Sequence, residues 1–160
     1  MDVLLDELHA GFPDLAQTAR LLIRMSVAML LGAIIGVQRE QYGKPAGLRT
    51  HILVSMGSAL FVIAAIESGM SSDGVSRVIQ GLTTGIGFIG AGAILKLAQG
   101  REIQGLTTAA GIWATAAVGV AVGLGLLGVA VLGVALIWFV LAVLGHFEIR
   151  LRREGDSRNR

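Results

Sequence analysis

The sequence predicts an all-α fold, a polytopic membrane bundle of five transmembrane helices. Of its 160 residues, 54% are hydrophobic and 15% are charged, whereas about a quarter of an ordinary soluble domain is charged. Most of its 23 glycines lie inside apolar segments, where small residues let helices approach closely in lipid. Lys and Arg gather at the ends of these segments, as in loops at a membrane surface. The segments also lack the polar faces that a soluble bundle would need.

Five apolar segments account for the predicted helices. The first three lie at residues 19–37, 51–68 and 77–97. Residues 103–145 contain no ionisable side chain, and as one helix they would extend about 65 Å. Because the hydrocarbon core of a bilayer is about 30 Å thick, this stretch must fold into a hairpin. We place its two spans at residues 105–122 and 125–147, with the break marked by Gly119, Gly123, Gly125 and Gly128.

The charges predict the orientation of the chain in the membrane. Residues 1–18 form an acidic leader without the basic start of a signal peptide, and residues 148–160 form a basic cytoplasmic tail after a 19–147 transmembrane domain. All but three of the 13 Lys and Arg residues lie in that tail or in the loops after the first and third segments. The positive-inside rule then predicts an N-terminus outside and a C-terminus inside, in agreement with an odd number of spans.

Several classes of function find no support in the residues. The chain has no cysteine, and its net charge of +2 does not indicate a nucleic-acid binder. No residue pair suggests an enzyme, and no His spacing suggests a metal site. Hard cations prefer oxygen ligands, so the weak metal candidates are carboxylates that fall on different sides of the predicted membrane: Glu40, Glu67 and Asp73.

Glycines at helical spacing predict helix packing rather than a cofactor site. Residues 85–90 match the dinucleotide pattern GxGxxG, but that pattern functions only between a strand and a helix. We therefore predict no cofactor and assign the glycines to close helix contacts, within the chain or between subunits. We expect Gly87→Leu or Gly90→Leu to disrupt assembly. The predicted packing residues are Gly32, Gly36, Gly81, Gly85, Gly87, Gly90, Gly92 and Trp113.

Arg24 and a short repeat are the polar features within the predicted spans. A charge at membrane depth normally faces the bundle or snorkels, and we expect Arg24 to pair with Glu67 or Asp73. The run QGLTT occurs at residues 80–84 and again at 104–108, and we expect each copy to start a helix. Its threonines then either cap and pack the helices or contact a solute: Thr83, Thr84, Thr107 and Thr108.

The loop after the first segment is dense in polar groups, among them Arg39, Glu40 and Arg49. It is either an anchor at the inner surface or a cytoplasmic contact site, with Glu40 accepting from Arg49 or neutralising an ion. Asp73 and Arg77 precede the third segment and either bind a ligand or hold the helix ends together.

Three motifs stand out along the chain. They are GVQRE with KPAGLRTH (residues 36–40 and 44–51), GIGFIGAGAI (85–94) and GLTTAAGIW (105–113). In this order, and with Asp73 and Arg77 in place, they resemble the signature of the MgtC/SapB family over residues 20–145. Gln38 stands where the family commonly has Glu, which weakens an acidic site there. The cytoplasmic C-terminal domain of virulence-associated members is absent, so the chain is more similar to short SapB-type members.

The resemblance implies a bacterial inner-membrane protein linked to growth under magnesium limitation and to intracellular survival. It also implies a link to restraint of the proton-driven ATP synthase, which makes that enzyme a candidate partner. Two functions remain open. One is a non-enzymatic regulator that contacts itself, as a homo-oligomer, or a membrane partner, favoured by the glycine-rich faces. The other is an oligomeric ion transporter or channel, with magnesium as a candidate ion, favoured by Arg24 and the repeat.

Overall fold

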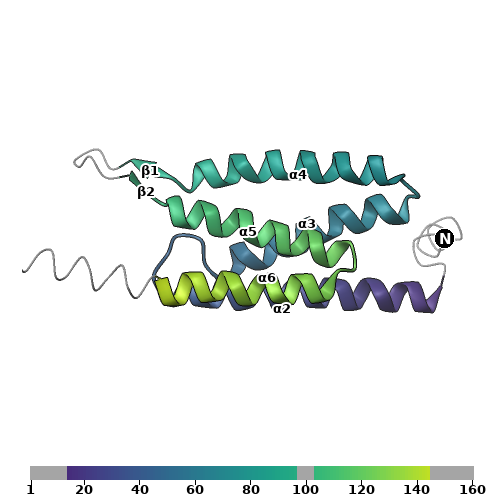
Figure 1. The fold of residues 1–160 in the computed structure, drawn as a ribbon, viewed down its shortest axis with the longest axis horizontal. Helices are drawn as coiled ribbons and strands as arrows, with labels where there is room; N and C mark the ends of the chain where they lie inside the picture. Colours follow the sequence, from purple (N-terminus) through teal and green to yellow (C-terminus); the bar gives the residue numbers. More distant parts are fainter. Residues whose placement is uncertain (1–13, 97–102, 145–160) are drawn as a thin grey trace, which may run out of the picture.

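The computed structural model describes residues 14–96 and 103–144, which form five helices joined by short connections (Figure 1). In chain order they are α2 (Leu15–Gln41), α3 (Leu48–Glu67), α4 (Ser72–Gly92), α5 (Leu106–Gly123) and α6 (Leu127–Phe139), which continues as a π-helical turn over Val140–Leu144. Two short strands, β1 (Leu95–Lys96) and β2 (Ile103–Gln104), pair antiparallel between α4 and α5. The predicted all-α bundle of five helices is confirmed.

Local signals explain where the helices begin and turn. Asp14 starts α2, because its carboxylate accepts a hydrogen bond from the Ala16 amide. Ser71 starts α4 in the same way, accepting from the amide of Gly74. Such side chains satisfy amides that have no partner within the helix. The turn between α5 and α6 passes through Gly125 with φ +80°, a backbone conformation that is easy only for glycine.

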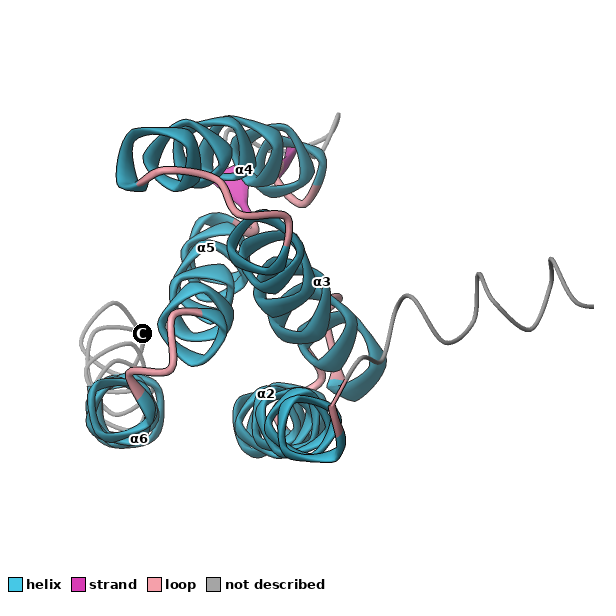
Figure 2. Cartoon of the chain, turned by 90° about the vertical axis from the view of Figure 1, so that its right-hand side faces the viewer, coloured by secondary structure: helices cyan, strands magenta, loops and turns pink. Residues whose placement is uncertain are grey.

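The helices lie in three layers (Figure 2). α3 and α5 form the middle layer, with α2 and α6 on one side and α4 on the other. α4 packs on both middle helices. Its opposite face is therefore turned away from the other described helices.

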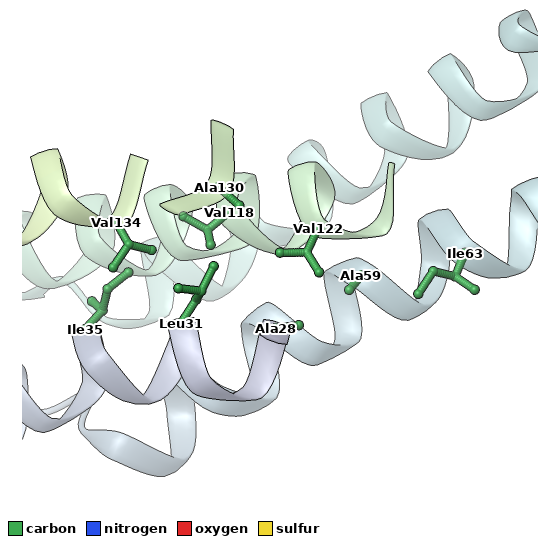
Figure 3. Packing of buried hydrophobic residues seen from close by; sticks show 9 residues of the cluster. All are labelled: Ala28, Leu31, Ile35, Ala59, Ile63, Val118, Val122, Ala130 and Val134. Atoms are coloured by element: carbon green, nitrogen blue, oxygen red, sulfur yellow. The ribbon is translucent and has the colours of Figure 1, made fainter. Parts of the chain in front are cut away.

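The main hydrophobic core lies where α2, α3, α5 and α6 meet (Figure 3). Each helix contributes small or branched apolar side chains spaced about one turn apart, which places them on one face. Small side chains at this centre keep the helices close together. The core residues are Ala28, Leu31, Ile35, Ala59, Ile63, Val118, Val122, Ala130 and Val134.

The outer surface of the bundle is apolar, as a lipid-facing surface must be. Phe88 on α4 is 83% exposed, and Phe61 on α3, Leu132 on α6 and Leu22 on α2 are also exposed. By length and composition, α2, α3 and α5 can each cross a membrane, whereas α6 is apolar but shorter. The chain is thus an all-α membrane bundle. That α4 and α6 also span the membrane, and that the N-terminus is outside, remain predictions.

The helix bounds differ from the predicted ones mainly at the third segment. We expected it at residues 77–97, but α4 begins at Ser72 because Ser71 caps it, and it ends at Gly92 before the β1–β2 hairpin. Gly119 and Gly123 were expected to mark the break of the last hairpin. Instead they lie within α5, and the break is at residues 124–126. The predicted 148–160 tail lies outside the described residues.

Candidate functional site

Buried polar side chains gather at one end of the bundle. At this end α2 ends, and α3 and α5 begin (Figure 1). All of them are at most 5% exposed. Such groups are costly inside a membrane protein and are retained where they have a role. We call the following six residues the polar cluster: Gln38 and Arg39 from α2, His51 and Ser55 from α3, and Thr108 and Thr115 from α5.

Two hydrogen bonds tie the helices together within the polar cluster. Arg39 Nη2 donates to Thr108 Oγ1 at 3.0 Å, joining α2 to the first turn of α5. His51 Nδ1 lies 2.7 Å from Thr115 Oγ1, joining α3 to α5. The Thr115 hydroxyl donates its single proton to the carbonyl of Gly111, at 2.8 Å. The Thr115 hydroxyl therefore links the His51 ring to the backbone of α5.

Four buried polar atoms of the cluster have no hydrogen-bond partner in the described part of the chain: Gln38 Oε1, Arg39 Nε, His51 Nε2 and Ser55 Oγ. Buried polar groups are nearly always paired, so each exception needs an explanation. No carboxylate of the described residues forms an ion pair with Arg39. Arg39 is 3% exposed, and within the described ranges its guanidinium makes one hydrogen bond, to a neutral hydroxyl.

Glycines let the helices around the polar cluster approach closely. A Cβ on Gly32 would lie 2.7 Å from the carbonyl oxygen of His51, and one on Gly36 would lie 2.7 Å from Leu48 Cα. These two predicted packing residues therefore form the α2–α3 contact. Gly119 brings α5 against α3 in the same way, since its Cβ would lie 2.2 Å from the carbonyl oxygen of Ser55.

Glu40 and Arg24 make contacts other than those expected. Glu40 does not pair with Arg49; its carboxylate accepts from the Leu48 amide at 2.8 Å and so caps the start of α3. The pairing of Arg24 with Glu67 or Asp73 is also wrong. Arg24 Nη1 donates to the carbonyl oxygen of Gly123 at 3.0 Å, because the last carbonyls of α5 lack helical partners and form the negative end of its dipole.

The acidic residues at the opposite end of the bundle do not form a metal site. Glu67 accepts a hydrogen bond from the side-chain amide of Gln17. Asp73 and Arg77 are exposed on the first two turns of α4. Glu40 lies in the last turn of α2, which ends at the other end of the bundle (Figure 1). In the described ranges, no group of three or more His, Cys, Asp or Glu side chains could hold a metal ion.

The two copies of the QGLTT repeat have different local structures. The second copy starts a helix, because Gln104 ends β2 and Gly105 precedes α5. The first copy lies in the interior of α4, so the expectation that it starts a helix is wrong. There Thr83 and Thr84 donate to backbone carbonyls of their own helix. Thr107 is exposed, and only Thr108 enters the polar cluster.

α4 presents exposed glycines to its surroundings. Gly81, Gly85 and Gly92 lie four and seven residues apart, about one and two turns, and therefore share a face. A Cβ on any of them would meet no atom within 4 Å. We call these three residues the glycine stripe. Gly87 is also open but lies on another face of the helix.

Gly90 packs within the chain, as one of the two predicted alternatives, whereas Trp113 is more exposed than expected. Gly90 is buried, and its Cβ would lie 3.6 Å from Ala109 on α5. Gly90→Leu would therefore push α4 away from α5, so it would report packing within the chain rather than assembly. Trp113, expected in helix packing, is 52% exposed and lines a narrow groove between α4 and α5.

Sequence reasoning missed most of the polar cluster. His51 was set aside because the three histidines lack metal-ligand spacing, and Ser55 and Thr115 were not considered. Helical spacing of the polar residues could have indicated that they share a buried face. His51 and Ser55 are four residues apart, as are Gly111 and Thr115, so each pair shares one helix face.

The chain resembles several known proteins. Residues 25–150 match the MgtC family. It is 47% identical over 141 residues to SrpB of Synechococcus elongatus, covering 81% of this chain and 75% of SrpB. It is 43% identical to YhiD of Escherichia coli strain K12, covering 84% of this chain and 65% of YhiD. With MgtC of Salmonella typhimurium strain LT2 it shares 41% identity over 104 residues, covering 65% of this chain and 43% of MgtC. No solved structure matches it.

Apolar helices around a buried polar cluster, with apolar side chains on the outside, define a polytopic membrane protein. The family match covers most of the chain and includes the motifs that build the cluster. The chain belongs to the MgtC family. It spans less than two thirds of the length of YhiD and less than half of that of MgtC.

Proposed function

We propose that this chain is a non-enzymatic regulatory protein of the bacterial inner membrane, which acts through contacts of α4 with a second copy or with another membrane protein. The observation that carries the proposal is the glycine stripe. Its three residues leave open space beside α4, on a helix that covers only one side of the α3–α5 layer (Figure 2).

Small residues matter here because lipid removes the hydrophobic drive for helix association. Helices in a bilayer associate through close van der Waals packing, for which glycine allows the shortest approach. The same kind of close packing occurs within this chain, where α3 packs directly against Gly32 and Gly36 of α2. The glycine stripe has the same chemistry, and the described residues of the same chain place nothing against it.

We infer the physiological context of this regulation from the family resemblance. Resemblance supports a role in adaptation to low magnesium or to intracellular stress, with the ATP synthase as a candidate partner. Contacts through a helix face suit such a role, because a regulator needs to bind its target and need not catalyse a reaction.

Assembly in membranes tests the proposal. We expect Gly85→Leu to reduce the oligomer or the partner complex in native-mass or crosslinking measurements, while the chain still inserts. Gly128→Leu on α6 is the matched control, because a Cβ there also meets nothing within 4 Å. Unchanged assembly of Gly85→Leu would refute the proposal.

Ion transport is the second candidate, and the polar cluster is the observation that favours it. The relative YhiD is provisionally named a magnesium transporter. Against a path through one chain, the interior beyond Ser58 and Thr115 is filled by the apolar core of the described helices. Magnesium flux into proteoliposomes that is lost in Arg39→Gln would favour transport, and absence of flux from folded protein would favour regulation.

A further inference from the structure

We propose that the groove beside α4, which runs from Ser72 to Trp113, binds one phospholipid with an acyl chain lying along the helix. This inference requires α4 to lie in the membrane, as predicted, but does not require the regulatory role proposed above. It rests on the shape of the groove, on the order of polar and apolar residues along it, and on its length.

The groove consists of a wide part and a narrow part, and Ile79 and Thr83 of α4 line both. The wide part lies beside the first half of α4 and has a volume of about 690 Å³, within the range of sites that hold small ligands. The narrow part lies between α4 and α5 and has a volume of about 130 Å³. Because the two parts share these residues, they form one groove that tapers along α4.

The polar residues of the groove lie where α4 begins. Ser72, Ser76 and Gln80 line the wide part and are exposed. They follow the turn at which α3 ends and α4 begins, at one end of the bundle (Figure 1). Asp73 and Arg77 are exposed beside them, and charged side chains are rare within the hydrocarbon of a membrane. The wide part therefore lies at the level of the lipid headgroups.

The groove becomes apolar away from this end. Ile86, Trp113 and Ala117 are among the residues that line the narrow part. The hydroxyl of Thr83, at the junction of the two parts, donates to the Ile79 carbonyl of its own helix at 2.8 Å and needs no partner from a ligand. The groove thus offers polar groups at the headgroup level and apolar surface at the hydrocarbon level. A phospholipid has its polar and apolar parts in the same order.

The length of the groove matches one leaflet of a bilayer. From Ser72 to Ile86, α4 extends about 21 Å, at about 1.5 Å per residue. Half of a bilayer, headgroups included, is about 20–22 Å thick. A phospholipid whose polar part lies at Ser72 and Ser76 therefore places the end of its acyl chain beside Trp113.

The narrow part favours an acyl chain over a helix of a second copy. A helix with its side chains is about 10 Å wide, and a space of about 130 Å³ does not accommodate it. A hydrocarbon chain is a single row of methylene groups and fits. Gly81 and Gly85 of the glycine stripe line neither part of the groove. A lipid in the groove therefore leaves the glycine stripe open to a partner.

Native mass spectrometry tests the proposal. The protein would be extracted from bacterial membranes in detergent, washed extensively with detergent and then measured. We expect a species that carries the mass of one phospholipid per chain. Folded protein without bound phospholipid would overturn the proposal. A lipid-free dimer would also overturn it and would assign the groove to a second copy.

A substitution in the narrow part locates the lipid. Ala117 is exposed and lines this part, so Ala117→Leu fills it without adding a larger side chain to the core, and we expect loss of the bound phospholipid. Ala64→Leu on α3 is the matched control, because Ala64 is exposed but lines neither part of the groove. The control should keep the wild-type occupancy.

Occupancy of Ala117→Leu equal to that of the wild type would overturn the location and with it the proposal. Equal losses in Ala117→Leu and Ala64→Leu would also overturn it, because the lipid would then not depend on the groove. If Ala117→Leu does not fold, Thr83→Leu, which adds bulk where the two parts meet, decides by the same criteria.

Discussion

Replacing Gly119 by alanine should separate α5 from α3 and destabilise the bundle. The added Cβ would lie 2.2 Å from the carbonyl oxygen of Ser55 and 2.8 Å from the Cβ of Ser58. To reach an ordinary contact of 3.4 Å, the oxygen would have to retreat by about 1.2 Å. This oxygen belongs to the backbone of a helix interior, so the whole segment of α3 must move with it.

The magnitude follows from the cost of overpacking. Extra methyl groups in a well-packed interior cost about 1–3 kcal/mol, and a backbone collision belongs at the upper end of that range. Alanine is favoured over glycine within a helix by about 1 kcal/mol, which offsets part of the loss. We therefore expect Gly119→Ala to lower the free energy of unfolding by about 2 kcal/mol.

Denaturant titration in detergent, followed by circular dichroism, measures this difference. The matched control is Gly57→Ala on α3, because a Cβ at Gly57 meets no atom within 4 Å, and alanine should be neutral or slightly stabilising there. Equal stability of Gly119→Ala and the wild type would refute the close α3–α5 approach.

Three further substitutions follow from the same geometry and are measured by the same titration. Arg24→Ala removes the charged hydrogen bond to Gly123 and should cost about 1.5–3 kcal/mol; no loss would contradict the role of Arg24 as a helix cap. Thr115→Val leaves His51 Nδ1 without a buried partner and should cost about 1–3 kcal/mol, whereas Thr115→Ser should stay near the wild type. Gly125→Ala should cost at least about 1–2 kcal/mol, because its φ of +80° is unfavourable for alanine; a neutral result would show that the turn adopts another conformation.

The sequence was sufficient to predict the bundle itself. Long apolar runs in lipid are expected to form helices, because a helix satisfies the hydrogen bonds of all its backbone groups internally. The hairpin of α5 and α6 was correctly predicted, since a single helix over residues 103–145 would exceed the bilayer. The glycines of this stretch were harder to assign. Gly125 makes the turn, whereas Gly119 and Gly123 serve packing on α3, and composition alone does not distinguish a turn glycine from a packing glycine.

The candidate site was less predictable, because it depends on which helix faces meet. Arg39 was chosen from its loop motif and expected near the surface, yet it is buried. Its burial requires α5 to place Thr108 beside it, a contact between residues far apart in sequence. Arg24 was expected to find a carboxylate, but a helix end supplies its partner. Charge complementarity read from a sequence overlooks backbone carbonyls at helix termini.

The outward face of α4 is the contact surface that the proposed regulatory function requires. Because the chain contains no cysteine, Gly85→Cys introduces a single thiol on the glycine stripe, and Gly128→Cys introduces one on α6 as the control. Oxidative crosslinking in native membranes then reports which face meets a partner. We predict a disulfide-linked species for Gly85→Cys, as a dimer of the chain or a complex with another membrane protein, and monomer for Gly128→Cys. Equal crosslinking of the two variants, or none of Gly85→Cys, would contradict the account.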